Sequence, residues 1–103
     1  MLRRLLQAVS LAALIAVPTL QRAQAEDTIR IAVIEPYSGP IAAIGRDFLQ
    51  GIQMAADDIN AAGGINGKKL EIVPLDNAMK AEKTTEQLRK AIDEGIRFVS
   101  QGV

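Results

Sequence analysis

The sequence contains no cysteine, no histidine and no tryptophan, and aromatic residues make up only 3% of it. Without cysteine there is no disulfide, no thiolate metal site and no residue to carry a lipid anchor at the start of an exported chain. Without histidine, the commonest general base and the commonest transition-metal ligand are missing. These absences argue against most classes of enzyme, and the remaining residues predict no metal or cofactor site.

The first 25 residues have the three parts of a secretory signal peptide. Arg3 and Arg4 precede an apolar run from Leu5 to about Leu20, and residues 23–25 form a small-x-small cleavage site. Polar residues and a proline interrupt the run, so we expect cleavage near Ala25; an uncleaved membrane anchor is the alternative. The mature protein is therefore expected in the periplasm.

Charge is balanced in the whole chain, which has 12 basic and 12 acidic residues. Cleavage after residue 25 would remove three arginines and leave 78 residues, nine basic and twelve acidic, with a net charge of −3. A mildly acidic domain whose basic residues are not interleaved with aromatics does not favour nucleic acid as a partner. A chain of this length supports only a marginal hydrophobic core.

The first half of the mature chain predicts a strand, a loop and a helix. Residues 28–34 are β-branched and nearly continuously apolar toward their end, which is typical of a strand covered on both faces of a parallel sheet. Two prolines and a glycine then predict a loop from Glu35 to about Ile44. From about residue 45 to 62, apolar residues recur at helical spacing and predict one buried stripe, made of Phe48, Ile52, Ala55, Ala56 and Ile59.

The second half predicts a strand, a helix and another strand. Gly63 and Gly64 end the first helix, because glycine adopts left-handed backbone angles without a steric penalty. Residues 69–76 predict a strand, and Pro74 marks it as an edge strand because proline has no N–H to donate to a neighbour. A helix is expected from about residue 79 to 94 and a strand over 96–100. The helix residues expected to point inward are Leu88, Ala91 and Ile92.

This alternation predicts an α/β fold, a βαβαβ part of a doubly wound parallel sheet. With residues 69–76 at the edge, the strand order is 2-1-3. That order places a topological switch between the first and third strands, and open α/β sheets bind ligands outside the carboxyl ends of the strands at such a point. We therefore expect a site between the loop after residue 34 and the residues that follow Ser100.

Four residues of the loop after the first strand are candidates for ligand contact. Tyr37 offers a ring face and a hydroxyl, and Ser38 can bind a polar ligand or cap its own turn. Ile41 and Ile44 can pack the loop or line a pocket for an apolar group. A dinucleotide site is not predicted, because the loop lacks the glycine spacing of that motif.

The order and spacing of several segments resemble the amino-terminal lobe of the type I periplasmic binding proteins that serve branched-chain amino acid ABC transporters. The matching segments are residues 31–40, Gly45, 55–67, 76–77 and 95–102. Members of this family have two α/β lobes that close on a small solute. The resemblance therefore implies a non-enzymatic solute-binding component with a membrane permease as its partner. It implies ligand contacts at Tyr37, Ser38, Ile41, Ile44, Gln101 and Gly102.

By this resemblance residues 26–103 form a partial, incomplete amino-terminal lobe, and the ligand is a branched-chain amino acid or a related small amino-acid-like solute. Three other interpretations stay open. The chain could be a nonfunctional truncated product, or a small exported interaction module that adds a partner strand to its exposed sheet edge. An enzyme of flavodoxin-like topology is the third, and no residue can be nominated as its catalyst.

Overall fold

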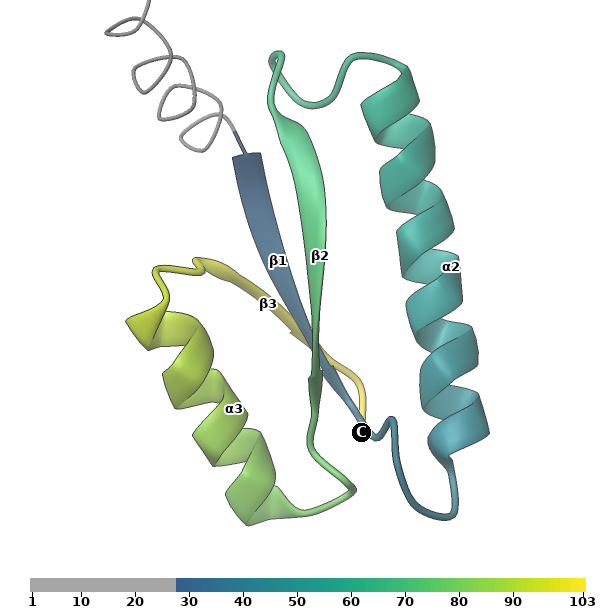
Figure 1. Ribbon diagram of the computed structural model, residues 1–103, viewed down its shortest axis with the longest axis vertical. Helices are drawn as coiled ribbons and strands as arrows, with labels where there is room; N and C mark the ends of the chain where they lie inside the picture. Colours follow the sequence, from purple (N-terminus) through teal and green to yellow (C-terminus); the bar gives the residue numbers. More distant parts are fainter. Residues whose placement is uncertain (1–27) are drawn as a thin grey trace, which may run out of the picture.

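The computed structural model describes residues 28–103, and the predicted signal peptide over residues 1–25 lies outside this part of the chain. Three strands and two helices alternate along it (Figure 1). Their bounds are β1 Thr28–Glu35, α2 Ala42–Ala61, β2 Lys69–Asp76, α3 Ala81–Asp93 and β3 Phe98–Gln101. Within residues 28–103 neither helix is both long and apolar enough to cross a membrane.

The strands form one parallel sheet in the order β2-β1-β3, which confirms the predicted fold class and strand order. Thr28 to Glu35 of β1 lie opposite Lys69 to Asp76 of β2, and Ile31 to Ile34 lie opposite β3. The first crossover runs from the central strand β1 to the edge strand β2, and the second runs back across the sheet from β2 to the other edge strand β3. Because the two crossovers run in opposite directions, right-handed connections place α2 and α3 on opposite faces of the sheet (Figure 1).

The core lies on the α3 face of the sheet. Ala32 and Ile34 of β1 are buried there with Leu75 of β2, Ala91 of α3 and Ile96, the residue that precedes the last strand. The alternation of a strand sends Val33 to the other face, where α2 buries Ala56. The central strand is thus covered on both sides, as its nearly continuous apolar run predicts.

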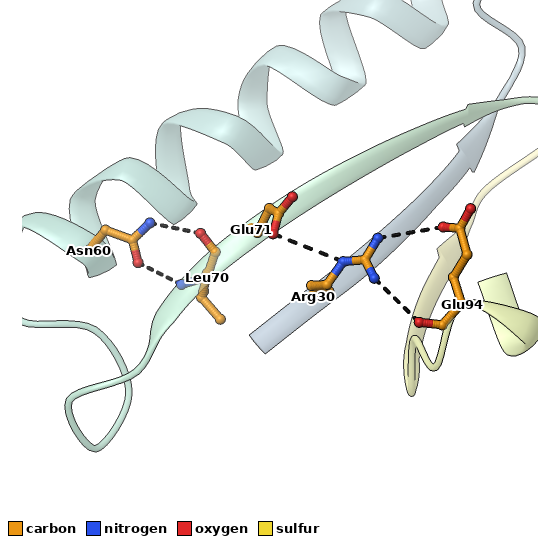
Figure 2. A network of polar contacts seen from close by, with 5 residues as sticks. All are labelled: Arg30, Asn60, Leu70, Glu71 and Glu94. Atoms are coloured by element: carbon orange, nitrogen blue, oxygen red, sulfur yellow. Dashed lines mark hydrogen bonds and ion pairs between the residues drawn. The ribbon is translucent and has the colours of Figure 1, made fainter. Parts of the chain in front are cut away.

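Strand β2 lies at the edge of the sheet, and side chains from the two helices form hydrogen bonds with several backbone groups on its outer side. Asn77 N–H donates to Glu35 O on β1, so the backbone groups of alternate residues 70, 72, 74 and 76 point away from β1. Asn60 pairs with Leu70, donating to its carbonyl at 2.8 Å and accepting from its N–H at 2.7 Å (Figure 2). Gln87 donates to the carbonyl of Asp76 at 2.9 Å. Pro74 falls in the same outward set, so its missing N–H removes no ladder bond.

Arg30, near the amino-terminal end of the central strand, contacts both β2 and the end of α3. Its guanidinium lies 3.9 Å from the Glu71 carboxylate on β2 and 3.5 Å from the Glu94 carboxylate after α3 (Figure 2). It also donates to the Glu94 carbonyl at 3.3 Å, close to the negative end of the helix dipole. These contacts are partly exposed, so they contribute little to the stability of the fold.

Three predicted boundaries were wrong. Helix α2 begins at Ala42, inside the predicted loop, because Gly45 has no side chain to obstruct packing of the first turn against the carbonyl of Pro36. Helix α3 begins at Ala81, because Ala78 and Met79 have positive φ angles of 49° and 61° that no helix allows. The last strand covers 98–101. Gly63 and Gly64 do end α2, with φ angles of 105° and 77°.

The predicted buried stripes were also partly wrong. On α2 only Ala56 of the expected set is buried, Ile52 is half-buried, and Phe48, Ala55 and Ile59 are exposed. On α3 Ala91 is buried, whereas Leu88 and Ile92 are exposed. Small alanines at the closest approach bring each helix axis near the sheet, and within residues 28–103 no further element covers the larger side chains on either flank.

Candidate functional site

A pocket of about 170 Å³ lies where the carboxyl ends of β1 and β3 meet. We call it the switch pocket, and it is lined by Glu35, Pro36, Ile41, Ile44, Gly45, Phe48, Gly102 and Val103. Three of the six residues predicted from the sequence, Ile41, Ile44 and Gly102, lie on its wall. The pocket occupies the place that the strand order predicts for a ligand.

The apolar wall of the switch pocket comes from the start of α2. Ile41 precedes the helix, and Ile44 and Phe48 follow at spacings of three and four, so the three residues lie along one side of the first two turns. Gly45 lies between them and is buried against the loop, since a Cβ at this position would collide with the carbonyl oxygen of Pro36. The missing side chain therefore sets how closely the apolar wall approaches the end of β1.

Glu35, the last residue of β1, is the charged residue among those that line the switch pocket. Only 2% of its surface is exposed. Its Oε1 accepts a hydrogen bond from Gly102 N at 2.6 Å, which joins the end of the central strand to the segment after β3. A Cβ at position 102 would lie 2.6 Å from Glu35 Oε1, so the carboxylate would have to shift to accommodate it. Glu35 thus holds together the two segments that form the switch point.

Tyr37 and Ser38 make internal hydrogen bonds beside the pocket. The Tyr37 hydroxyl donates to the carbonyl of Val33 at 2.8 Å, and Ser38 Oγ donates to Asp76 Oδ2 at 2.7 Å. Burial, and then the negative charges of Glu35 and Asp76, raise the pKa of Tyr37 to about 12. Tyr37 is therefore a neutral donor at physiological pH, while the Ser38 side chain is exposed.

Asp76, at the end of β2, is a hub that joins two loops at this edge. Its Oδ1 accepts from the backbone N–H groups of Tyr37 and Ala78, both at 2.9 Å. The pKa of Asp76 is lowered, mainly by the hydrogen bond from Ser38. The two backbone N–H groups and the charge of Lys83 lower it further, whereas burial raises it by less than the Ser38 hydrogen bond lowers it. The ionised carboxylate holds the loop after β1 against the loop after β2.

Asn77 connects the same edge to the end of the described chain. It is 1% exposed, and its Nδ2 donates to Thr84 Oγ1 at 3.0 Å and to the carbonyl of Val103 at 2.9 Å. Its Oδ1 accepts from Met79 N at 3.1 Å, which supports the left-handed turn before α3. Asp76, the last residue of β2, and Asn77, which follows it, thus position all three loops at the carboxyl edge of the sheet.

Gln101 does not join the switch pocket. It lines a separate hollow of about 240 Å³ on the α3 side, with Asn77, Met79, Lys80, Ala81, Thr84 and Val103. Strand alternation sends neighbouring residues 101 and 102 to opposite sides of the sheet. The six predicted residues are therefore divided among the pocket wall, the loop that borders it and this second hollow.

Sequence reasoning missed Glu35, Phe48, Asp76 and Asn77 as parts of the site. Phe48 was assigned to the core by its helical spacing, Asp76 was predicted only as the end of the edge strand and as part of the resemblance, and Asn77 was noted only as part of the resemblance. A usable signal existed for Glu35, since a carboxylate directly follows an unbroken apolar strand at a predicted switch point. Within residues 28–103 no group of three or more acidic residues is arranged to hold a metal ion.

A larger hollow of about 320 Å³ lies at the opposite, amino-terminal end of the strands. Arg30, Lys68 and Arg97 line it together with Thr28, Ile29, Gly95 and Phe98. The carboxyl ends of α2 and α3 face this end of the sheet, and basic residues there complement the negative ends of the helix dipoles. Its position is not the one at which open α/β sheets bind ligands.

Comparison with known families gives one match that spans the described chain. The family described as "Periplasmic binding protein" matches residues 28–103. Among curated proteins, the Leu/Ile/Val-binding protein of Escherichia coli K12 is 40% identical over 89 residues, which cover 86% of this chain and 24% of that protein. The leucine-, isoleucine-, valine-, threonine- and alanine-binding protein of Pseudomonas aeruginosa is 40% identical over 75 residues, 73% of this chain and 20% of that protein.

Solved structures share the fold. The branched-chain amino acid transporter substrate-binding protein LivJ from Streptococcus pneumoniae, solved in complex with isoleucine, superposes with a TM-score of 0.61 at 37% identity. The match covers 66% of this chain and 20% of that one. The chain thus spans about a quarter of the length of the curated relatives that it matches.

Proposed function

The chain belongs to the periplasmic binding protein family, and we propose that it is part of the extracytoplasmic solute-binding component of an ABC transporter. In this proposal the component binds branched-chain amino acids or related small amino-acid-like solutes for uptake. The names of the relatives support this class of ligand, since they are binding proteins for leucine, isoleucine and valine. The proposal concerns a longer protein, because the chain spans only a quarter of those relatives.

One observation carries the proposal. The switch pocket, at the carboxyl end of the central strand, has a mostly apolar wall that includes Ile41, Ile44 and Phe48, and Glu35 and Gly102 also line it. Such a pairing suits a small solute that has an apolar side chain beside polar groups. In this proposal Tyr37 and Ser38 border the bound solute, and Gln101 and Gly102 begin the loop that contacts it.

The remaining features of the proposal concern the architecture around the pocket. Residues 1–25 are a signal peptide removed near Ala25, and residues 26–103 are part of an amino-terminal lobe. The protein works in the periplasm, where a second lobe closes over the solute and the loaded form docks on a membrane permease. Its function is reversible capture without chemistry, in keeping with relatives that are named as binding proteins.

The test is ligand binding by the full-length protein with matched substitutions on α2. Ile44 and Met54 are 63% and 62% exposed, but only Ile44 lines the switch pocket. Ile44→Ser should weaken leucine, isoleucine and valine binding about tenfold, because it removes roughly 1–2 kcal/mol of apolar contact. Met54→Ser should leave it unchanged. Calorimetry that detects no binding of these three amino acids by the unmodified protein would reject the proposed ligand class.

A further inference from the structure

The connection between α2 and β2 contains a tight two-residue turn made of Asn66 and Gly67. Ile65 and Lys68, on either side of the turn, exchange two backbone hydrogen bonds of 2.8 and 2.9 Å. Asn66 and Gly67 have φ angles of 52° and 79°, and positive angles at both central residues are those of a type I′ turn. The hydrogen bonds of this connection all lie within residues 58–70, so local contacts build it.

The turn leaves two groups that can react with each other open to solvent. Asn66 and Gly67 are both exposed. Within residues 28–103 no hydrogen bond involves the side-chain amide of Asn66 or the backbone N–H of Gly67. A Cβ at Gly67 would meet nothing within 4 Å, and glycine itself has no side chain to hinder an approach to its nitrogen.

The other two asparagines of the chain are held differently, and alanine follows each of them. The Asn60 side chain donates to the carbonyl of Leu70 and accepts from its N–H. Asn77 is 1% exposed, and its side-chain nitrogen donates to Thr84 Oγ1 at 3.0 Å. Of the three asparagines, Asn66 is therefore the one that combines a free amide with an unhindered nitrogen in the next residue.

We propose that Asn66 is a site of spontaneous deamidation, with water as the co-reactant. The Gly67 nitrogen loses its proton to the solvent and attacks the side-chain carbonyl carbon of Asn66. The new C–N bond closes a succinimide ring, while the C–N bond of the side-chain amide breaks and its nitrogen takes up a proton and leaves as ammonia. Water then opens the ring at either carbonyl and gives aspartate or isoaspartate. The charges of Lys68 and Lys69, which follow directly, favour the anionic nitrogen.

Formation of isoaspartate should change the geometry of the turn. The main chain then runs through the former side chain and gains one carbon, whereas a two-residue turn fixes the register of the residues that flank it. The pair of Ile65 and Lys68 no longer fits, and the neighbouring pair of Asn60 and Leu70 loses its support. Because the turn precedes β2 in a parallel sheet, deamidation loosens the sheet edge at the end opposite the switch pocket (Figure 1).

The test is incubation of the full-length protein in mildly alkaline buffer, followed by peptide mass spectrometry that separates aspartate from isoaspartate. The peptide with Asn66 should gain one mass unit at least about tenfold faster than those with Asn60 and Asn77, which corresponds to an activation free energy lower by about 1.4 kcal/mol. Asn66→Gln should abolish the new acidic species on ion exchange. Gln53→Ala, which removes an exposed side-chain amide from α2, should leave its rate of formation unchanged.

Protection of Asn66 by its own turn is the competing explanation. Conversion of Asn66 no faster than that of the other two asparagines would overturn the proposal, because the turn would then hold the amide away from the Gly67 nitrogen. Aspartate without isoaspartate would overturn the succinimide route. Hydrogen exchange tests the structural effect: the isoaspartate fraction should exchange the N–H groups of Lys68 and Leu70 faster than Asn66→Asp, which has the same charge and an unmodified backbone. Equal exchange would overturn the loosening of the edge, and none of these measurements depends on solute binding.

Discussion

Ser38 Oγ lies 2.7 Å from Asp76 Oδ2 and donates a hydrogen bond that joins the loop after the central strand to the end of the edge strand. Asp76 also accepts from two backbone N–H groups, so a single carboxylate organises the border of the switch pocket. This contact connects residues that lie 38 positions apart in the chain. Stability of the loops is thereby coupled to the geometry of the site.

Removal of this carboxylate should destabilise the fold. Asp76→Ala leaves the N–H groups of Tyr37 and Ala78 without their acceptor, and we expect a loss of about 1–3 kcal/mol in the free energy of unfolding. Urea denaturation followed by circular dichroism measures this change. Asp58→Ala, on the exposed surface of α2, should change the free energy by less than about 0.5 kcal/mol. Equal effects of the two substitutions would contradict the role of Asp76.

The lowered pKa of Asp76 predicts a specific dependence of stability on pH. Folding lowers the pKa of Asp76 from its ordinary value of 3.8. The stabilisation that the ionised carboxylate gives the fold is therefore complete at pH values above the unfolded-state pKa, and it is lost as the pH falls through the folded-state pKa. The stability difference between wild type and Asp76→Asn should therefore be constant from about pH 7 to 5 and shrink toward pH 3. A difference that does not change over this range would show that the carboxylate charge is not responsible.

Tyr37 should titrate late, and its signal can be read without interference because it is the single tyrosine of the chain. Its pKa is raised to about 12, so the neutral form is favoured in the folded state. The stabilisation that the neutral Tyr37 hydroxyl gives the fold is complete below about pH 10 and is lost as the pH rises from about 10 to 12. Ultraviolet absorbance of tyrosinate should show a midpoint near 12 in buffer and near 10 in concentrated urea. Coincident midpoints would mean that Tyr37 is not buried.

Two glycines of α2 should respond in opposite directions to alanine. Gly45→Ala places a Cβ against the Pro36 carbonyl and should lower stability by about 1–3 kcal/mol, because the first turn must move away from the end of β1. A Cβ at Gly51 meets nothing within 4 Å. Gly51→Ala should therefore raise stability by about 0.5–1 kcal/mol through helix propensity alone. Thermal unfolding of the two variants is the measurement, and stabilisation by both would refute the close approach at Gly45.

Asn60 should protect the edge of the sheet. Asn60→Ala removes both hydrogen bonds to Leu70 and leaves an N–H and a carbonyl of the edge strand open. We expect a loss of about 1–3 kcal/mol and a greater tendency to self-associate, because unpaired strand edges recruit other strands. Light scattering at increasing concentration measures the association. Gln53→Ala, which removes an exposed contact with Asp57 on α2, is the control.

Local chemistry predicted the fold well because each element carried its own signal. The apolar run of residues 31–34 indicated a central strand, and Pro74 indicated the edge, so the order β2-β1-β3 followed from two short segments. Boundaries were harder. The start of α2 depends on a contact between Gly45 and the Pro36 carbonyl, and the start of α3 on the left-handed angles of Ala78 and Met79. Neither the contact at Gly45 nor the backbone angles of Ala78 and Met79 leave a periodic pattern in the sequence.

The site was predicted in position but only partly in composition. Ile41, Ile44 and Gly102 line the pocket because the segments after β1 and β3 meet at the carboxyl ends of these strands. Phe48 could not be assigned, since the same helical spacing serves a core and a pocket wall. Glu35 gains its place from a contact with Gly102, 67 positions further along the chain, and such a pairing depends on the register between β1 and β3.

The contact between Glu35 and Gly102 limits how homologous sequences can diverge. A side chain at position 102 would place its first carbon 2.6 Å from Glu35 Oε1, so the carboxylate would have to turn away and lose its hydrogen bond with the backbone N–H of residue 102. Homologues that keep glutamate at position 35 should therefore keep glycine at position 102. Larger residues at 102 should appear together with a shorter residue at 35, so that the two positions covary across the family.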